Sequence, residues 1–267
     1  MPQTIQRELD DQGFVTLRLN RPEVHNAFDA SLIGELTAEL KSIAADDRIR
    51  GVVLTGNGKS FSAGADLNWM KSMVEAGEAE NKQDALRLAE LMRTLEFLPK
   101  PTIAMVNGAA MGGGVGLVAC CDIAIAAEGA KFALSEAKLG LVPAVISPYV
   151  IRRIGQGQAR RYFLTAEIFD AARAEQLGLV SECVAEAELE SSVEQLKRFI
   201  AKSGPLAVRH AKQLIGIIQG NSAQAQQTLD EATADLIAKL RVSPEAQEGM
   251  SAFLDKRPAE WVPPKTH

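Results

Sequence analysis

Two hydrophobic periodicities alternate along the chain as far as about residue 185. Apolar side chains alternate with polar ones or form short unbroken runs at 14–19, 51–55, 102–106 and 122–127, which predicts four strands. Apolar residues recur every three to four positions at 31–44 and 84–98, which predicts amphipathic helices. Strands that alternate with helices in this way are typical of a layered α/β fold.

The pattern changes near residue 185. Strand signals cease, and helical periodicity follows near 186–201, 205–219, 222–240 and 244–254. The junction has no stretch rich in Pro, Gly or Ser, so we expect these helices to pack on the first part or on a neighbouring subunit. We therefore divide the chain into a β/α core, 1–185, and a C-terminal helical region, 186–267.

Composition limits the class of protein. The 267 residues are 46% hydrophobic, enough for a large core, and the net charge of −5 gives no bulk attraction to nucleic acid or an acidic membrane. The three cysteines have neither the spacing of a disulfide framework nor that of a zinc site. The first ten residues lack the apolar segment of a secretory signal, so we expect a cytoplasmic protein.

Residues 101–121 contain no charged side chain over about the length of a membrane span. The segment is rich in glycine, however, and too weakly hydrophobic for insertion. It predicts a core strand followed by a buried helix.

Several familiar signatures fail on inspection. Positions 58–60 resemble the end of a phosphate loop, but Val53 stands where the first glycine is required. Residues 112–116 lack the glycine order of a dinucleotide-binding turn. The chain has no G-x-S-x-G or H-E-x-x-H motif, which argues against a serine hydrolase or a zinc enzyme of the familiar kinds.

Two glycine-bearing turns, 61–67 and 107–114, each follow a strand or strand-like segment. Small residues let a ligand approach the main chain, and a helix that starts at either turn adds its dipole. Each turn alone is also explained as an ordinary connection between a strand and a helix. Together, they can present one N–H each to a single oxygen, which is what an oxyanion hole requires.

Six further segments lie between about residues 5 and 260. They are Asn20-Arg21-Pro22 with Asn26-Ala27, Gly64-Ala65-Asp66-Leu67, the run 108–114, Cys121-Asp122-Ile123-Ala124, Phe132 with Glu136 and 139–143, and Phe253 with Lys256-Arg257-Pro258. In their order and spacing, these segments resemble the enoyl-CoA hydratase/isomerase (crotonase) superfamily. The resemblance implies an α/β fold, a crotonase-like ββα superhelix with a C-terminal helical region. It also implies an enzyme whose substrate is an acyl-CoA.

The resemblance assigns roles to individual residues. It implies that the N–H groups of Ala65 and Gly113 bind the thioester oxygen and that Glu136 moves protons. Contacts with coenzyme A are implied for His25, Ala63, Gly64, Asp66, Leu67, Gly112 and, from a neighbouring subunit, Lys256. No metal or redox cofactor is implied, because the coenzyme A thioester is the substrate, and the family forms homotrimers or hexamers.

The acid/base residues depart from the pattern of typical family hydratases, which use two glutamates. This chain keeps Glu136 but has Gly116 where the first glutamate is expected. A lone carboxylate can take a proton from water and return one to Cα, or it can shuttle a proton between C2 and C4. Hydration, double-bond isomerisation and decarboxylation therefore stay open, as does a non-catalytic member that binds acyl-CoA or RNA.

Residues 64–70, 114–122 and 140–150 resemble bacterial methylglutaconyl-CoA hydratases of leucine breakdown and their isohexenylglutaconyl-CoA relatives, which also lack the first glutamate. This resemblance favours hydration of a branched, acidic enoyl-CoA such as 3-methylglutaconyl-CoA. A distal carboxylate suits a bidentate arginine, for which Arg152 and Arg153 are candidates.

Overall fold

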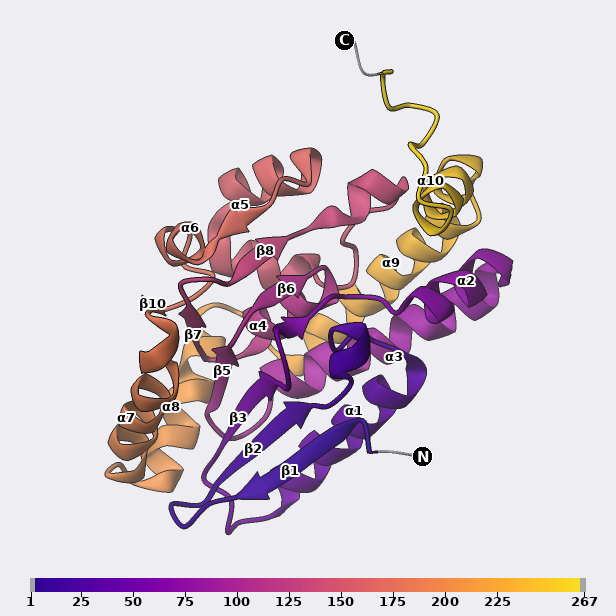
Figure 1. Cartoon of the computed structure of the whole chain (residues 1–267). Helices are drawn as coiled ribbons and strands as arrows, with labels where there is room; N and C mark the ends of the chain where they lie inside the picture. Colours follow the sequence, from indigo (N-terminus) through magenta and orange to yellow (C-terminus); the bar gives the residue numbers. More distant parts are fainter. Residues whose placement is uncertain (1–2, 265–267) are drawn as a thin grey trace.

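The computed structural model describes residues 3–264, which fold around two β-sheets (Figure 1). The six-stranded sheet has the order β1-β2-β3-β5-β7-β10, and the four-stranded sheet the order β4-β6-β8-β9. Each contains one antiparallel pair, β1 with β2 and β8 with β9. The bounds are β1 Ile5–Leu9, β2 Phe14–Leu19, β3 Gly51–Gly56, β4 Ser60–Ser62, β5 Thr102–Val106, β6 Ala109–Met111, β7 Ile123–Ala127, β8 Lys131–Ala133, β9 Phe169–Asp170 and β10 Glu182–Val184.

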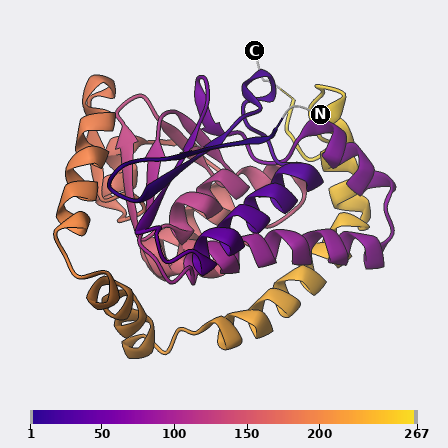
Figure 2. The ribbon, with the colours of Figure 1, turned by 90° about the horizontal axis from the view of Figure 1, so that it is seen from below.

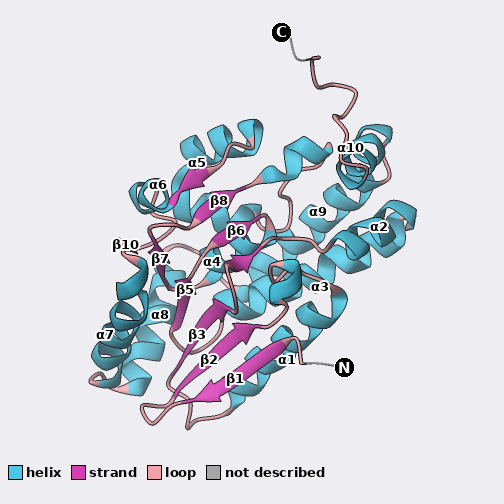
Figure 3. Ribbon diagram, in the orientation of Figure 1, coloured by secondary structure: helices cyan, strands magenta, loops and turns pink. Residues whose placement is uncertain are grey.

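Helices cover both faces of the larger sheet, as Figure 3 shows. Strand side chains such as Val52 and Leu54 pack into the main core with α1, α3 and α4, while the alternate residues, such as Val53, pack against α7. The bounds are η1 Pro22–Val24, α1 Ala30–Ala45, α2 Leu67–Glu75, α3 Glu78–Glu96, α4 Gly113–Cys120, η2 Ser135–Leu139, α5 Ser147–Thr165, α6 Ala171–Gln176, η3 Glu186–Glu188, α7 Leu189–Ala201, α8 Pro205–Ile218, α9 Ala223–Arg241 and α10 Pro244–Leu254.

The structure confirms the α/β class, the four predicted strands and the helices at 31–44 and within the C-terminal region. After β10 ends at Val184, the described chain is helical, and α9 lies along α3 (Figure 2). The helix predicted to begin at 84 begins instead at Glu78, because its first six residues are mostly polar and carry no apolar period.

The uncharged segment 101–121 forms β5, β6 and the buried helix α4, as predicted. No helix within residues 3–264 has the length and hydrophobicity to cross a membrane.

Asn26 fixes the loop that lies beside the first glycine turn. Its side chain is fully buried, and its backbone takes a left-handed conformation, φ 55°, that asparagine tolerates. The side-chain oxygen accepts a hydrogen bond from the Arg21 N–H at 2.9 Å, while Nδ2 donates to the carbonyl oxygens of Asn57 and Ser60 at 2.9 and 2.8 Å. These bonds join the loop to the beginning of β4.

Replacing Asn26 with Ala is expected to lower the free energy of unfolding by about 2 to 3 kcal/mol, because three backbone groups, one buried and two partly buried, lose their partner. Urea denaturation measures this change. Asn68→Ala serves as the control, since Asn68 is exposed, and it should change the free energy by no more than about 0.5 kcal/mol. Equal effects of the two substitutions would contradict the role of Asn26.

Candidate active site

The turn at 61–67 requires glycine at its centre. Gly64 has φ +86°, and a Cβ added there would lie 3.0 Å from the carbonyl oxygen of Met111 in the second turn. The two glycine turns, almost fifty residues apart in sequence, are therefore in contact.

Phe28 holds the first turn through its backbone. Its N–H donates to the Gly64 carbonyl at 2.6 Å, and its carbonyl accepts from the Asp66 N–H at 2.8 Å. Ala65 lies between these bonds and is exposed. Within residues 3–264 the Ala65 N–H has no acceptor, so it is available to a ligand.

Asp66 then starts helix α2. Its Oδ1 accepts hydrogen bonds from the N–H groups of Asn68 and Trp69 at 2.8 and 3.3 Å, and its Oδ2 pairs with Arg21 at 3.0 Å. The residue is only 4% exposed. Its carboxylate is thus engaged in holding the turn, and a contact of Asp66 with coenzyme A would have to come from its backbone.

The second turn leads directly into helix α4. Gly112 has φ +50° and donates its N–H to Ala133, and Gly113 is the first residue of the helix. A Cβ added at Gly113 would lie 2.5 Å from the Phe28 ring, so the same phenylalanine touches both turns. The Gly113 N–H, at the positive end of the α4 dipole, has no acceptor in the described chain.

Glu136 lies beside the second turn. Its Oε1 is 3.1 Å from the position that a Cβ would take at Gly112, and its Oε2 is buried with no hydrogen-bond partner in the part of the chain that the structure describes. Burial raises the pKa of this carboxyl group to about 7. Such a group can accept and donate a proton at neutral pH with little driving force in either direction.

The position of the missing glutamate is filled by apolar side chains. A Cβ at Gly116 would overlap Cγ2 of Ile146 and lie 3.1 Å from Cε of Met92. Both side chains are buried. The site therefore has one carboxylate, and no side chain fits at residue 116 unless Ile146 moves.

The residues expected to contact coenzyme A are partly gathered at the first turn. The His25 carbonyl oxygen accepts a hydrogen bond from the Ala63 N–H at 2.9 Å. His25 is exposed, and its ring Nδ1 lies 3.0 Å from the Ser60 hydroxyl oxygen. Ala63 and Leu67 are exposed on the same turn. Lys256 follows α10 and is exposed, with no side-chain hydrogen bond or ion pair among the described residues. These contacts stay predictions.

The enoyl-CoA hydratase/isomerase family model matches residues 10–264. A 2,3-dehydroadipyl-CoA hydratase of Escherichia coli is 36% identical over 94% of this chain and 95% of its own. Two solved enoyl-CoA hydratases, from Shewanella pealeana and Mycobacterium avium, are 42% and 33% identical with TM-scores of 0.79 and 0.86. They cover 97% and 98% of this chain, which spans 96% and 100% of theirs.

The chain belongs to the enoyl-CoA hydratase/isomerase family. Its crotonase fold is thereby established, and its activity is of the enoyl-CoA hydratase/isomerase type on acyl-CoA thioesters. The donor and acid/base roles of Ala65, Gly113 and Glu136 remain predictions that the geometry supports.

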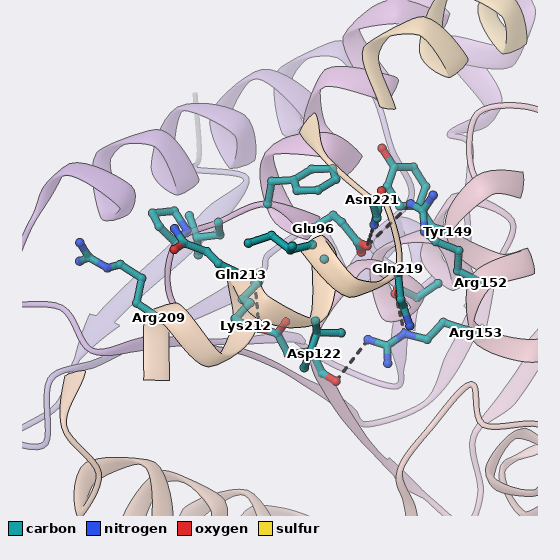
Figure 4. A pocket seen from close by; sticks show the side chains of 17 residues that line it. Glu96, Asp122, Tyr149, Arg152, Arg153, Arg209, Lys212, Gln213, Gln219 and Asn221 are labelled. Atoms are coloured by element: carbon teal, nitrogen blue, oxygen red, sulfur yellow. Dashed lines mark hydrogen bonds and ion pairs between the residues drawn. The ribbon is translucent and has the colours of Figure 1, made fainter. Parts of the chain in front are cut away.

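For this enoyl-CoA hydratase/isomerase, the proposal that Arg152 or Arg153 faces the acyl group is corrected. Both line a cavity of about 490 Å³ between α5 and α8 (Figure 4). Arg153 donates to the carbonyl oxygens of Ala119 and Asp122, at the end of α4 opposite Gly113. Arg152 donates to Gln226 and lies over the Tyr149 ring. Their positions in the helix after residue 146 gave no indication of which end of α4 they approach.

Phe28 and Arg21 are parts of the site that the sequence pattern does not predict. Arg21, within the Asn-Arg-Pro segment, donates to the Ala27 carbonyl and pairs with Asp29 and Asp66. Asp66 at the predicted start of a helix, together with Arg21 in the Asn-Arg-Pro segment, is the sequence signal that could have indicated this ion pair. Nothing in the sequence marked Phe28.

Glu136→Gln is expected to stabilise the protein at high pH. The folded-state pKa of about 7 lies above the ordinary value of 4.5, so the wild type loses stability as pH rises from 4.5 through 7. Relative to the wild type, the variant should gain about 3 kcal/mol of unfolding free energy between pH 4.5 and 8. Urea denaturation at both pH values tests this, and a pH-independent difference would contradict it.

Proposed function

We propose that the protein hydrates an α,β-unsaturated enoyl-CoA, with Glu136 as the single acid/base group. The observation that carries this proposal is the Glu136 carboxyl group, which is buried, has a partnerless oxygen and lies beside the turn that begins α4. The N–H groups of Ala65 and Gly113 have no acceptor within residues 3–264 and lie on adjoining turns.

In the proposed reaction, the thioester oxygen accepts hydrogen bonds from Ala65 and Gly113, which stabilise the charge that develops on it. Glu136 takes a proton from water while the water oxygen bonds to Cβ and the double-bond electrons move toward the thioester. Glu136 then gives that proton to Cα of the enolate. Water adds on one face, the carboxylate is regenerated, and no metal or redox cofactor enters.

The proposed substrate is branched and acidic, with 3-methylglutaconyl-CoA as its representative. Two observations support this class. Three segments of the chain resemble methylglutaconyl-CoA hydratases of leucine breakdown, and the E. coli relative is named for 2,3-dehydroadipyl-CoA, whose acyl group also ends in a carboxylate.

Purified protein is expected to remove the enone-thioester absorbance of 3-methylglutaconyl-CoA and to give a product heavier by one water. Glu136→Gln should lower kcat by about 100- to 10,000-fold, because the proton carrier is lost. Glu182→Gln, a change at an exposed carboxylate, is the control and should retain the wild-type rate.

Mass spectrometry separates this reaction from its rivals. An unchanged mass with a shifted double bond would indicate isomerisation, and loss of CO₂ would indicate decarboxylation. A Gln variant at full rate would contradict the role of Glu136.

Helix α8 supports a homo-oligomer as part of the proposal. The side of α8 nearest its own subunit carries Arg209 and Lys212, which pair with Asp47 and Asp122. Five of its apolar side chains are each more than half exposed: Leu206, Leu214, Ile215, Ile217 and Ile218, of which Ile215 and Ile217 also line the cavity beside α5. An apolar face this large favours burial against another copy. We propose a homotrimer or hexamer in the cytoplasm, where the three free cysteines stay reduced.

Leu214→Glu combined with Ile217→Glu is expected to dissociate the oligomer, because two charges would be buried in the contact. Light scattering coupled to gel filtration would show the change in mass. Gln219→Glu adds a charge near the end of the same helix and should leave the mass unchanged. A monomeric wild type, or an intact double variant, would contradict this assignment.

A further inference from the structure

The cavity between α5 and α8 lies apart from the proposed enolate site. Its volume of about 490 Å³ is within the range of pockets that hold small organic ligands. Ala119, in the last turn of α4, lines the cavity, and it is six residues beyond Gly113, roughly 9 Å along the helix axis. Ala65, Gly113 and Glu136 do not line it. A molecule in this cavity therefore leaves the proposed reaction site free.

Helix α8 forms one wall of the cavity without packing tightly on the rest of the subunit. None of its residues is buried, whereas α7 and α9, the helices before and after it, each bury several. Ile215 and Ile217 line the cavity and are 62% and 71% exposed. The other walls include Leu98 and Tyr149, both buried. An apolar molecule in the cavity would remove this exposed hydrophobic surface from water.

The charged part of the lining is mainly cationic. Four basic and two acidic side chains line the cavity: Arg152, Arg153, Arg209 and Lys212, and Glu96 and Asp122 (Figure 4). A hollow with walls of low dielectric constant concentrates the field of such charges. The excess of two positive charges therefore favours an anionic ligand.

Two of the four cations already have close partners. Lys212 pairs with Asp122 at 2.8 Å, and this contact ties α8 to the body of the subunit. Arg153 donates to the carbonyl oxygens of Ala119 and Asp122 at 2.9 and 3.2 Å. A ligand would have to break these bonds to engage either side chain, so the more weakly paired arginines are the better candidates.

Arg152 is held in place but incompletely paired. Its guanidinium carbon lies 4.9 Å from the centre of the Tyr149 ring, and Nη2 donates to Gln226 at 3.0 Å. Within residues 3–264, the one carboxylate that lies within 4.0 Å belongs to Glu96, at 3.7 Å, and Nε and Nη1 donate no hydrogen bond. Burial raises the pKa of Glu96, which makes it a weaker counter-ion. A positioned guanidinium with unused donors suits a planar carboxylate.

We propose that this cavity is a second ligand site, which takes a monocarboxylate with an apolar body of the size of a medium-chain fatty acid. The carboxylate accepts hydrogen bonds from Arg152, and the chain lies against Ile215, Ile217 and Tyr149. Both parts of the ligand are needed, because the lining combines an excess of positive charge with an exposed apolar surface. The assignment does not depend on which reaction Glu136 catalyses.

Isothermal titration calorimetry with octanoate tests the assignment. Octanoate should bind the wild type in the presence of saturating butyryl-CoA, which occupies the acyl-CoA site. Acetate, which lacks the chain, and 1-octanol, which lacks the charge, should each bind at least about 10-fold more weakly. Arg152→Gln should weaken octanoate binding by about 10-fold or more. Arg160→Gln removes an exposed cation of the same helix that does not line the cavity, and it should bind octanoate as the wild type does.

A variant that fills the cavity provides a second measurement. Gln213 is exposed on α8 and lines the cavity, so Gln213→Trp should abolish octanoate binding without unfolding the protein, which circular dichroism verifies. Displacement of octanoate by butyryl-CoA, or undiminished binding by a folded Arg152→Gln or Gln213→Trp, overturns the assignment. So does a wild type that binds no octanoate, the result expected if a second copy of the chain closes the cavity.

Discussion

The contact of two glycine turns at Phe28 is the constraint on which the site depends. The backbone of Phe28 brackets Ala65, and its ring leaves no room for a side chain at Gly113. An N–H group can stabilise a developing oxyanion only if it is fixed before the reaction, because reorganisation would consume the electrostatic gain. One residue that touches both turns fixes the two donors relative to each other, and Asp66 and Arg21 add rigidity from outside.

Burial brings the pKa of Glu136 near neutrality, and the same burial destabilises the folded protein when this carboxyl group is ionised. A second carboxylate nearby would raise its pKa further, but Ile146 and Met92 occupy that position, so desolvation alone raises the pKa to about 7. The ionised form has no cationic partner among residues 3–264. Some folding stability is lost to hold a base near neutrality, which is a common trade-off at catalytic sites.

The predictable parts of the fold and site are those with a local cause. The strands follow from short apolar runs, and the turns at Gly64 and Gly112 follow from backbone conformations that favour glycine. Glu136 is predictable only through a family resemblance, since a lone carboxylate has no local signature. Phe28 and Ile146 act through contacts with segments far away in the sequence, and no periodicity encodes which segments meet. Arg153 is a further example, because the sequence predicts a helix there but not that its side chain bonds the Ala119 and Asp122 carbonyl oxygens.

The dipole of helix α4 accounts for the position of Arg153 at the carboxyl end of that helix. The helix is buried along nearly its whole length and carries no charged side chain, so its dipole is poorly screened. At one end Gly113 presents a free N–H to the proposed oxyanion, and at the other Arg153 donates to two carbonyl oxygens. A cation at the carboxyl end and a developing anion at the amino end both stabilise the same dipole. Arg153 therefore stabilises α4 from the end opposite Gly113, and the proposed oxyanion would stabilise the same helix from its first turn.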